Sequence, residues 1–400
     1  MTASSLCKSL ILAGALAWLG TDVSFAEKRY GPGVTDTEIK IGQTMPYSGP
    51  VSLNSPTGKT MTAYFAKINE EGGVNGRTIK LISLDDGYSP PRTMEQTRKL
   101  VEDEDVLIIF GTLGTPTNLA IQKYLNGKKV PQLFITTGVT KFGDPKNYPW
   151  TMGFMANFAT EASAYATYVL RNRADAKIGV LYQNDDYGKD LLKGLKAALG
   201  DKATKLIVAE STYEVTDPTV DQQIITLKSS GADVFMNFST PKAAAQAIRK
   251  TYDIGWHPLH FLASPSNSMS GTLKPVGFDK AVGLISATYS KDPSDPQWTS
   301  DPGVQGYLVF MKKYYSEADP TDPNALRGYD EAMALVHVLK QCGEDLTREN
   351  VMRQATDLKA LQLPMLLPGI TVNTSSTNYF PINQVQLERF DGAHWTRLGQ

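Results

Sequence analysis

The chain has 400 residues, a formal net charge of −1 and 41% hydrophobic residues. This length exceeds one typical domain and the apolar content can fill a sizeable core, so we expect two domains. The near-neutral charge, with no basic stripe along the chain, argues against a nucleic-acid partner, because phosphate binding requires a basic surface.

Residues 1–26 have the pattern of a secretory signal peptide. Lys8 supplies a positive charge, residues 10–19 form an apolar stretch too short to span a bilayer, and Ser24 and Ala26 are small residues suited to a cleavage site. The alternative is a retained N-terminal anchor. Because no later stretch approaches about 18 consecutive apolar residues, we expect a soluble mature protein, exported by a cleaved signal peptide.

Cleavage would leave the mature chain with one cysteine. Cys7 lies in the leader, so Cys342 alone remains. No intrachain disulfide is then possible, and stability must come from the core.

From residue 38 onward, short apolar runs alternate with segments of helical spacing. Strands are expected at 39–42, 79–84, 107–110 and 133–136. Helices are expected at 59–70, at 92–102 and from Thr115 onward. This alternation predicts βαβ units and a parallel sheet.

The same rhythm restarts after a loop at 145–149. Further strands are expected at 178–183, 205–209, 234–238, 259–262 and 282–289, and at 384–390 and 395–398 around the hairpin turn Asp391-Gly392. Further helices are expected at 159–171, 184–199, 217–228, 241–252, 304–315, 325–341 and 347–355. The second half repeats the architecture of the first without repeating its sequence, which indicates two lobes of similar fold that the C-terminal pieces complete.

The turn after the strand at 107–110 reads GTLGTP. Thr115 followed by Pro116 is typical of a helix start, in which the threonine hydroxyl caps a free backbone N–H and proline gives up a donor that has no partner. Free N–H groups and the positive end of the helix dipole would favour an anion at this edge of the sheet. An ordinary strand-to-helix turn is the alternative.

The other strand ends carry neutral hydrogen-bonding groups and aromatic rings, at the edge where open parallel sheets bind ligands. These groups lie in 47–49, 136–140, Tyr187, Ser239-Thr240-Pro241 and Ser264-Pro265-Ser266. They suit holding a small ligand, with Ser239 and Pro265 as candidate contacts, and do not suit activating a nucleophile. The alternative is that the hydroxyl-proline pairs are only helix caps, and a cap is what we expect of Asp217-Pro218.

No phosphate-binding loop, dinucleotide-binding glycine motif, nucleophile elbow or zinc-protease motif occurs in the sequence. The four histidines lack metal-ligand spacing. Asp85-Asp86 and Asp185-Asp186 could suggest carboxylate chemistry, but such pairs at strand ends are usually caps or solvated turns. We therefore expect no enzyme activity, no metal and no cofactor.

Several motifs, taken in their order, resemble one known family. They are IGQTMPYSGP, INEEGGVNGRTIKLISLDD, GTLGTPTN, ITTGVT, IGVLYQNDDYGKD and QLERFDGAHW. Over essentially its whole mature length the chain resembles the periplasmic solute-binding proteins of ABC transporters, in the class of the Leu/Ile/Val-binding proteins. The resemblance implies a type I periplasmic binding fold, an α/β architecture of two flavodoxin-like (Rossmann-like) three-layer lobes joined by a three-strand hinge, with a ligand trapped between them by hinge closure.

The resemblance also implies how the chain divides. The first lobe would hold residues 27–155 and 287–372, and the second would hold 156–286 and 373–400. The chain would cross between the lobes near Ala156, Ala287 and Asn373.

The family's ligand contacts fall on particular residues of this sequence. Its carboxylate-binding position falls on Thr115, and the next pair of contacts falls on Gly138 and Thr140. The aromatic contact from the second lobe falls on Tyr187, and the first-loop contact falls near Asn54.

This chain departs from the family where the ligand's ammonium would lie. Amino-acid-binding members have a carboxylate there, whereas this chain has Pro265, and a second acidic position holds Asn157. An ammonium buried without a counter-charge would cost several kcal/mol. The ligand is therefore expected not to be a simple α-amino acid. The family's first-lobe disulfide is also absent, since its two positions fall on Tyr88 and Gly114.

These observations together predict a monomeric periplasmic receptor that binds a small organic acid, apolar or aromatic, and delivers it to the membrane permease of an ABC importer. Its carboxylate would contact Thr115, Gly138 and Thr140, and its body would contact Tyr187. One alternative is a receptor for a branched-chain amino acid or amide. Others are a sensory subunit that reports to a regulator, and an enzyme built on the same scaffold.

Overall fold

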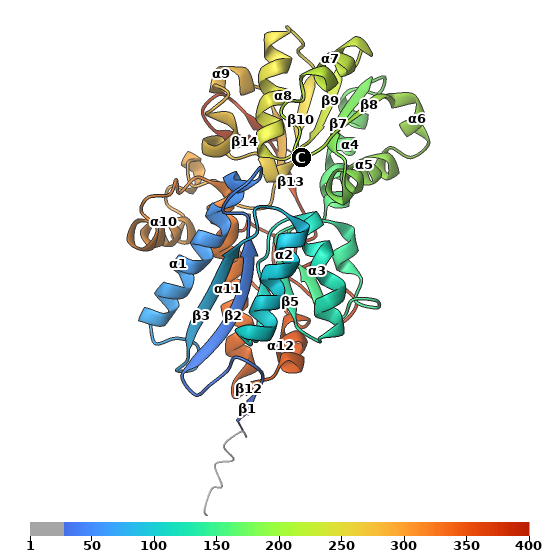
Figure 1. Ribbon diagram of the computed structural model, residues 1–400. Helices are drawn as coiled ribbons and strands as arrows, with labels where there is room; N and C mark the ends of the chain where they lie inside the picture. Colours follow the sequence, from blue (N-terminus) through green and yellow to red (C-terminus); the bar gives the residue numbers. More distant parts are fainter. Residues whose placement is uncertain (1–27, 400) are drawn as a thin grey trace, which may run out of the picture.

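Two sheets, each covered by helices, form the two lobes of the chain (Figure 1). The computed structural model describes residues 28–399, so the expected signal peptide lies outside the described residues. Among residues 28–399, no helix is both long enough and apolar enough to cross a membrane.

The first lobe has a five-stranded parallel sheet in the order β3-β2-β4-β5-β6. Its strands are β2 (Glu38–Met45), β3 (Thr78–Asp85), β4 (Ile108–Phe110), β5 (Gln132–Ile135) and β6 (Thr151–Gly153). Along β4, Ile108 and Phe110 join one core cluster and Ile109 joins another. Both faces of the strand are therefore buried, which explains its unbroken apolar sequence.

Helices cover these two faces. α2 (Pro90–Arg98) and α3 (Thr115–Gly127) pack together on one face, and α1 (Pro56–Glu70) packs against α11 (Pro323–Cys342) on the other. The C-terminal helices α10 (Pro302–Tyr314) and α12 (Arg348–Ala355) complete this lobe. At its far end, β1 (Arg29–Tyr30) pairs in parallel with β12 (Asp345–Leu346).

The second lobe has a seven-stranded sheet in the order β14-β13-β11-β10-β9-β7-β8. The parallel strands are β7 (Ile178–Gln183), β8 (Ile207–Tyr213), β9 (Val234–Phe238), β10 (Leu259–Leu262) and β11 (Ile285–Thr288). β13 (Gln386–Phe390) and β14 (Trp395–Arg397) extend one edge as an antiparallel hairpin, as the turn Asp391-Gly392 predicts. The helices are α4 (Phe158–Asn172), α5 (Asp186–Leu199), α6 (Ala203–Leu206), α7 (Asp221–Ser229), α8 (Pro241–Asp253) and α9 (Phe278–Ala281).

The alternating α/β order is confirmed, and three local predictions are wrong. β6 lies where no strand is expected, because its three residues, TMG, are too few to show a strand periodicity. The strand expected at 205–209 starts at Ile207, after a short helix. Asp217 does not cap a helix: it accepts a hydrogen bond from the Glu214 N–H in a turn, and α7 begins at Asp221.

The chain passes between the lobes three times, between β6 and α4, between β11 and α10, and ahead of β13. In the last passage Tyr379 and Ile382 still pack in the first-lobe core, and Val385 contacts the cores of both lobes. Ala287 pairs with Leu387 inside the second-lobe sheet. The division of the chain expected from the sequence stays a prediction, and this packing favours crossings slightly later than Ala287 and Asn373.

α11 is the helix that fixes the position of the site described below. It is buried along most of its length, and Gly328 lets it approach α1, because a Cβ at Gly328 would lie 2.2 Å from the Thr57 carbonyl oxygen. That separation is too short for any carbon atom. The contact therefore requires glycine.

We expect Gly328→Ala to lower the free energy of unfolding by about 1–3 kcal/mol, because the new methyl group must push α11 away from α1. Gly306→Ala on α10 is the matched control, since a Cβ at Gly306 meets no atom within 4 Å. That change should raise the free energy of unfolding by up to about 1 kcal/mol. Urea denaturation measures both, and equal effects would contradict the close packing of α11.

Candidate functional site

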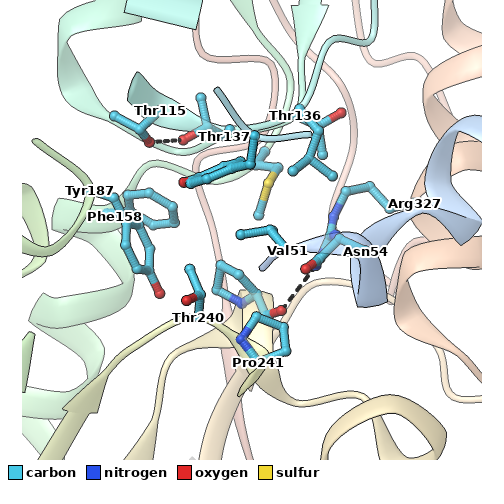
Figure 2. Close-up of a pocket in the computed structure, with 15 residues that line it drawn as sticks. Val51, Asn54, Thr115, Thr136, Thr137, Phe158, Tyr187, Thr240, Pro241 and Arg327 are labelled. Carbon is cyan, nitrogen blue, oxygen red and sulfur yellow. Dashed lines mark hydrogen bonds between the residues drawn. The ribbon is translucent and has the colours of Figure 1, made fainter. Parts of the chain in front are cut away.

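A cavity lies between the lobes, where the carboxyl ends of the two sheets face each other (Figure 2). The space between its lining atoms is about 410 Å³, part of which is open to solvent, and a water-sized molecule can be centred in about 40 Å³ of it. Its lining residues are Val51, Asn54, Tyr88, Leu113, Gly114, Thr115, Thr136, Thr137, Met155, Phe158, Tyr187, Thr240, Pro241, Pro265 and Arg327. Most of these side chains are apolar or carry a neutral hydroxyl.

The start of α3 forms one end of the cavity. Gly114, at a φ of 106°, is the residue before the helix, and Thr115 is its first residue, so the prediction that the Thr115 hydroxyl caps the helix is wrong. The hydroxyl lies 2.7 Å from the Thr137 hydroxyl instead. Among the described residues, the Thr115 backbone N–H has no hydrogen-bond acceptor. The positive end of the helix dipole therefore faces the cavity with a free donor.

Arg327, on the first turns of α11, lies at the other side of the cavity. Its side chain is 7% exposed, its Nη1 donates to Asn324 Oδ1 at 2.9 Å, and its Nε has no partner among the described residues. It makes no salt bridge with a described carboxylate. Of the 15 lining residues, Arg327 is the one with a formal charge at neutral pH.

Two buried acids lie close to Arg327 without lining the cavity. Glu331, one turn further along α11, accepts a hydrogen bond from the Thr136 hydroxyl at 2.7 Å, and burial raises its pKa to about 8. Burial also raises the pKa of Glu161, whose carboxylate accepts bonds from the Ser264 N–H and hydroxyl. The positive charge of Arg327 lowers the pKa of both acids, but burial outweighs this effect, so the protonated form of Glu331 is favoured at pH 7.

The second lobe contributes an aromatic and apolar wall. Asp185 caps α5 by accepting from the Tyr187 N–H at 2.9 Å, as expected for one acid of the Asp185-Asp186 pair. The Tyr187 ring packs edge-on against Phe158 at 5.2 Å between centroids, and its hydroxyl donates to the Ser239 carbonyl. Burial raises the pKa of Tyr187 well above its usual range, so this hydroxyl stays neutral.

Four of the residues predicted as ligand contacts line the cavity: Asn54, Thr115, Tyr187 and Pro265. Asn54 also joins the lobes, since its Nδ2 donates to the Pro265 carbonyl at 3.3 Å and to Asn324 Oδ1 at 2.9 Å. The lobes are therefore in direct contact beside the cavity.

The other four lie outside the lining and have structural partners. Gly138 has no room for a side chain, because a Cβ there would lie 2.5 Å from the Ala156 carbonyl oxygen. Thr140 donates to Asp190 of the second lobe through its N–H at 2.9 Å and its hydroxyl at 2.5 Å. Asn157 caps α4, and Ser239 is fully buried beneath Tyr187.

The sequence reasoning missed Arg327, the strongest electrostatic feature of the site. The predicted helix 325–341 contains it, but nothing local shows that this late helix returns to the first lobe. A usable signal was the charged group Arg327, Asp330 and Glu331 inside an otherwise apolar helix. Phe158 and Met155 were also missed, because they lie in a crossing segment and not at a strand end.

Tyr88 and Gly114, the two positions on which the resemblance places a family disulfide, are neighbours here. A Cβ at Gly114 would lie 2.5 Å from Cε2 of Tyr88, so the ring packs directly on the glycine backbone. Both line the cavity. The contact between these two positions is an aromatic ring packed on a glycine backbone.

No reactive group accompanies these side chains in the cavity, whose lining lacks histidine, cysteine and carboxylate residues. Elsewhere in residues 28–399, no three acidic, histidine or cysteine side chains gather closely enough to hold a metal ion. The arrangement is suited to binding a ligand through hydrogen bonds and one positive charge.

A family model described as periplasmic binding protein matches residues 38–391. The chain belongs to this family. The Leu/Ile/Val-binding protein homolog 7 of Brucella suis biovar 1 (strain 1330) is 24% identical over 349 residues, which cover 84% of this chain and 86% of the relative. Family members bind small-molecule ligands and work with ABC permeases.

Solved structures of this fold superimpose well on the periplasmic binding protein described here. A branched-chain amino acid ABC transporter protein from Thermus thermophilus with bound valine gives a TM-score of 0.83 at 15% identity, covering 92% of this chain and 97% of that one. A fatty acid ABC transporter substrate-binding protein from Thermomonospora curvata gives 0.78 at 20% identity, covering 93% and 94%. The type I periplasmic binding fold is confirmed, and at these identities the likeness speaks for the fold alone.

We expect Asn157→Ala to lower the free energy of unfolding by about 1 kcal/mol, because the Thr160 N–H loses its cap at the start of α4. Ligand affinity should change less than about twofold, since Asn157 does not line the cavity. Asn172→Ala, at the exposed other end of α4, is the control and should change stability by less than about 0.5 kcal/mol. A large loss of affinity in Asn157→Ala would restore this residue to the ligand contacts.

We expect the stability of the protein to fall as pH rises from about 5 to 8, and Glu331→Gln to reduce this slope. The pKa of Glu331 is raised from 4.5 to about 8 in the folded state, so between these values the folded chain holds a proton that the unfolded chain has released. The free energy of unfolding then falls by up to about 1.4 kcal/mol per pH unit for each such proton. Burial also raises the pKa of Asp330 to about 8, so part of the slope should remain in the variant.

Urea denaturation at several pH values measures the slope. Glu349→Gln, at an exposed position of α12, is the control for loss of a negative charge. An unchanged slope in Glu331→Gln would show that Glu331 is ionised in the folded protein at neutral pH, and would weaken the case for an uncompensated Arg327.

Proposed function

We propose that this periplasmic binding protein holds a small organic acid, with an apolar or aromatic body, between its lobes and delivers it to the membrane permease of an ABC importer. The observation that carries the proposal is Arg327, a buried guanidinium that lines the cavity without a carboxylate partner. Membership of the periplasmic binding protein family supports the transport role.

The charge of the cavity favours an anion. A buried charge without a salt-bridge partner is unfavourable by several kcal/mol, and a ligand carboxylate paired with the Arg327 guanidinium, which lines the cavity, would offset part of that penalty. Guanidinium groups match carboxylates in shape as well as charge. The Arg327 guanidinium and the Thr115 backbone N–H can both donate hydrogen bonds to oxygen atoms of a ligand.

The body of the ligand would contact the apolar wall. Val51, Leu113 and Met155 supply aliphatic surface, and Phe158 and Tyr187 supply two rings held edge to face. Burial of an apolar or aromatic body against these groups contributes about 25 cal/mol for each Å² removed from water.

A branched-chain amino acid is the second candidate, because curated relatives are named Leu/Ile/Val-binding proteins and one structural neighbour holds valine. An α-amino acid needs a counter-charge for its ammonium, and the lining offers none. Glu161 is a buried acid of the second lobe outside the lining, and it already accepts bonds from Ser264 and Tyr165. We therefore rank a branched-chain amino acid as a less favoured ligand than an organic acid.

We expect Arg327→Gln to weaken binding of the best organic acid on the order of 100-fold, because the ligand carboxylate loses a buried cationic partner. The same change should leave the free protein as stable as before or more stable, since it removes an unpaired buried charge. A thermal-shift screen of aliphatic acids, aromatic acids and leucine, isoleucine and valine identifies the ligand, and calorimetry gives its affinity.

Arg98→Gln, at an exposed position of α2, is the control for a change in net charge and should leave affinity unchanged. Leucine or valine binding more tightly than every acid, with no loss of affinity in Arg327→Gln, would overturn the proposal and favour the amino-acid alternative.

A further inference from the structure

The cavity has two polar ends, which lie on opposite sides of the first-lobe sheet edge. Thr136 and Thr137 follow β5 directly, and successive residues of an extended chain point to opposite sides. The Thr136 hydroxyl donates to Glu331 on α11, whereas the Thr137 hydroxyl pairs with Thr115 at the start of α3. Figure 2 shows Arg327 and Thr115 at opposite sides of the cavity.

The α11 end holds a full positive charge. Arg327 keeps Nε free, and the neighbouring Glu331 is largely protonated at pH 7 because burial raises its pKa to about 8. A carboxylate of the ligand at this end would meet a cation that forms no salt bridge with a described carboxylate, although Glu161 and Glu331 lie near enough for its charge to lower their pKa values.

The α3 end offers donors and a partial positive charge. Thr115 and Thr137 are both nearly fully buried, and one of their two hydroxyl protons forms the bond between them, which leaves the other free to donate. The Thr115 N–H is also free among the described residues, and the end of a helix this long carries roughly half a positive charge. Such an end favours an anion over a neutral group.

The surface between the two ends is apolar. Val51, Leu113 and Met155 line it, and no lining residue carries a negative charge. A ligand with one carboxylate would satisfy one end and leave the donors of the other without an acceptor. A ligand with a carboxylate at each end of a short hydrocarbon or aromatic spacer would satisfy both.

We propose that the ligand is a small dicarboxylate, with one carboxylate on Arg327 and the other on the Thr115–Thr137 pair and the free N–H at the start of α3. This inference rests on the proposed function, and it adds a second anionic group to the ligand and a specificity role for the two threonines.

Calorimetry on the wild-type protein tests the inference with pairs of ligands. Each pair is a dicarboxylic acid, aliphatic or aromatic and of increasing length, together with its monoamide, which has the same shape and one negative charge less. We expect the best diacid to bind at least about tenfold more tightly than its monoamide, because a charged acceptor forms stronger bonds than a neutral one. A monoamide or monoacid that binds as tightly as the diacid would overturn the inference.

Variants separate the two ends. In Thr115→Val with Thr137→Val, the preference for the diacid over its monoamide should fall to about twofold or less, because the hydroxyl donors are lost at constant side-chain shape. Thr97→Val is the matched control, since the Thr97 hydroxyl is buried in α2 without a partner and outside the cavity. An unchanged preference in the double variant would contradict the second carboxylate site.

The two proposals fail in different ways. Loss of binding to both the diacid and the monoamide in Arg327→Gln, together with equal affinities in the wild type, would leave the organic-acid function standing and remove the dicarboxylate. Unchanged affinity for both ligands in Arg327→Gln would remove the organic-acid function as well. The wild-type comparison needs no variant to fold, so it decides the inference even if the threonine pair proves essential for stability.

Discussion

The electrostatics of the cavity depend on one group, a buried guanidinium that forms no salt bridge with a described carboxylate. Arg327 is unfavourable where it lies, and the chain holds it there by burying α11 along most of its length and by packing Gly328 against α1. Glu331, an acid one turn further along the same helix, has a pKa raised to about 8 and accepts a hydrogen bond from the Thr136 hydroxyl. Under the proposed function, a ligand carboxylate paired with Arg327 would offset this cost on binding.

The sequence was sufficient for the architecture, and four of the eight residues predicted as ligand contacts line the cavity. Alternating apolar runs and helical segments specify parallel sheets, and glycine and proline mark most turns. Asn54, Thr115, Tyr187 and Pro265 reach the cavity because they follow strand ends or belong to the first loop, positions that topology alone brings together. Local signals failed where tertiary packing overrides them, as in the Thr115 hydroxyl, which bonds to Thr137 and caps nothing.

Local patterns in the sequence could neither exclude the predicted residues that lie outside the cavity nor reveal Arg327. Gly138, Thr140 and Asn157 lie within a few residues of the cavity along the chain, but a missing Cβ, an inter-lobe bond to Asp190 and a helix cap account for them. Arg327 lies about 190 residues along the chain from the threonines that it faces, so only the packing of a late helix on an early sheet reveals it.

The presence of a single cysteine among residues 28–399 has a practical consequence. Cys342, the one cysteine among residues 28–399, is buried, and burial raises its pKa to about 12, which keeps the thiol unreactive. Residues 28–399 contain one cysteine and so cannot form a disulfide among themselves; with a reductant present to block disulfides between chains, they can be unfolded in denaturant and refolded without an oxidant. Unfolding would release any ligand that the protein had bound in the cell that produced it. Mass spectrometry of the released small molecules would then identify that ligand.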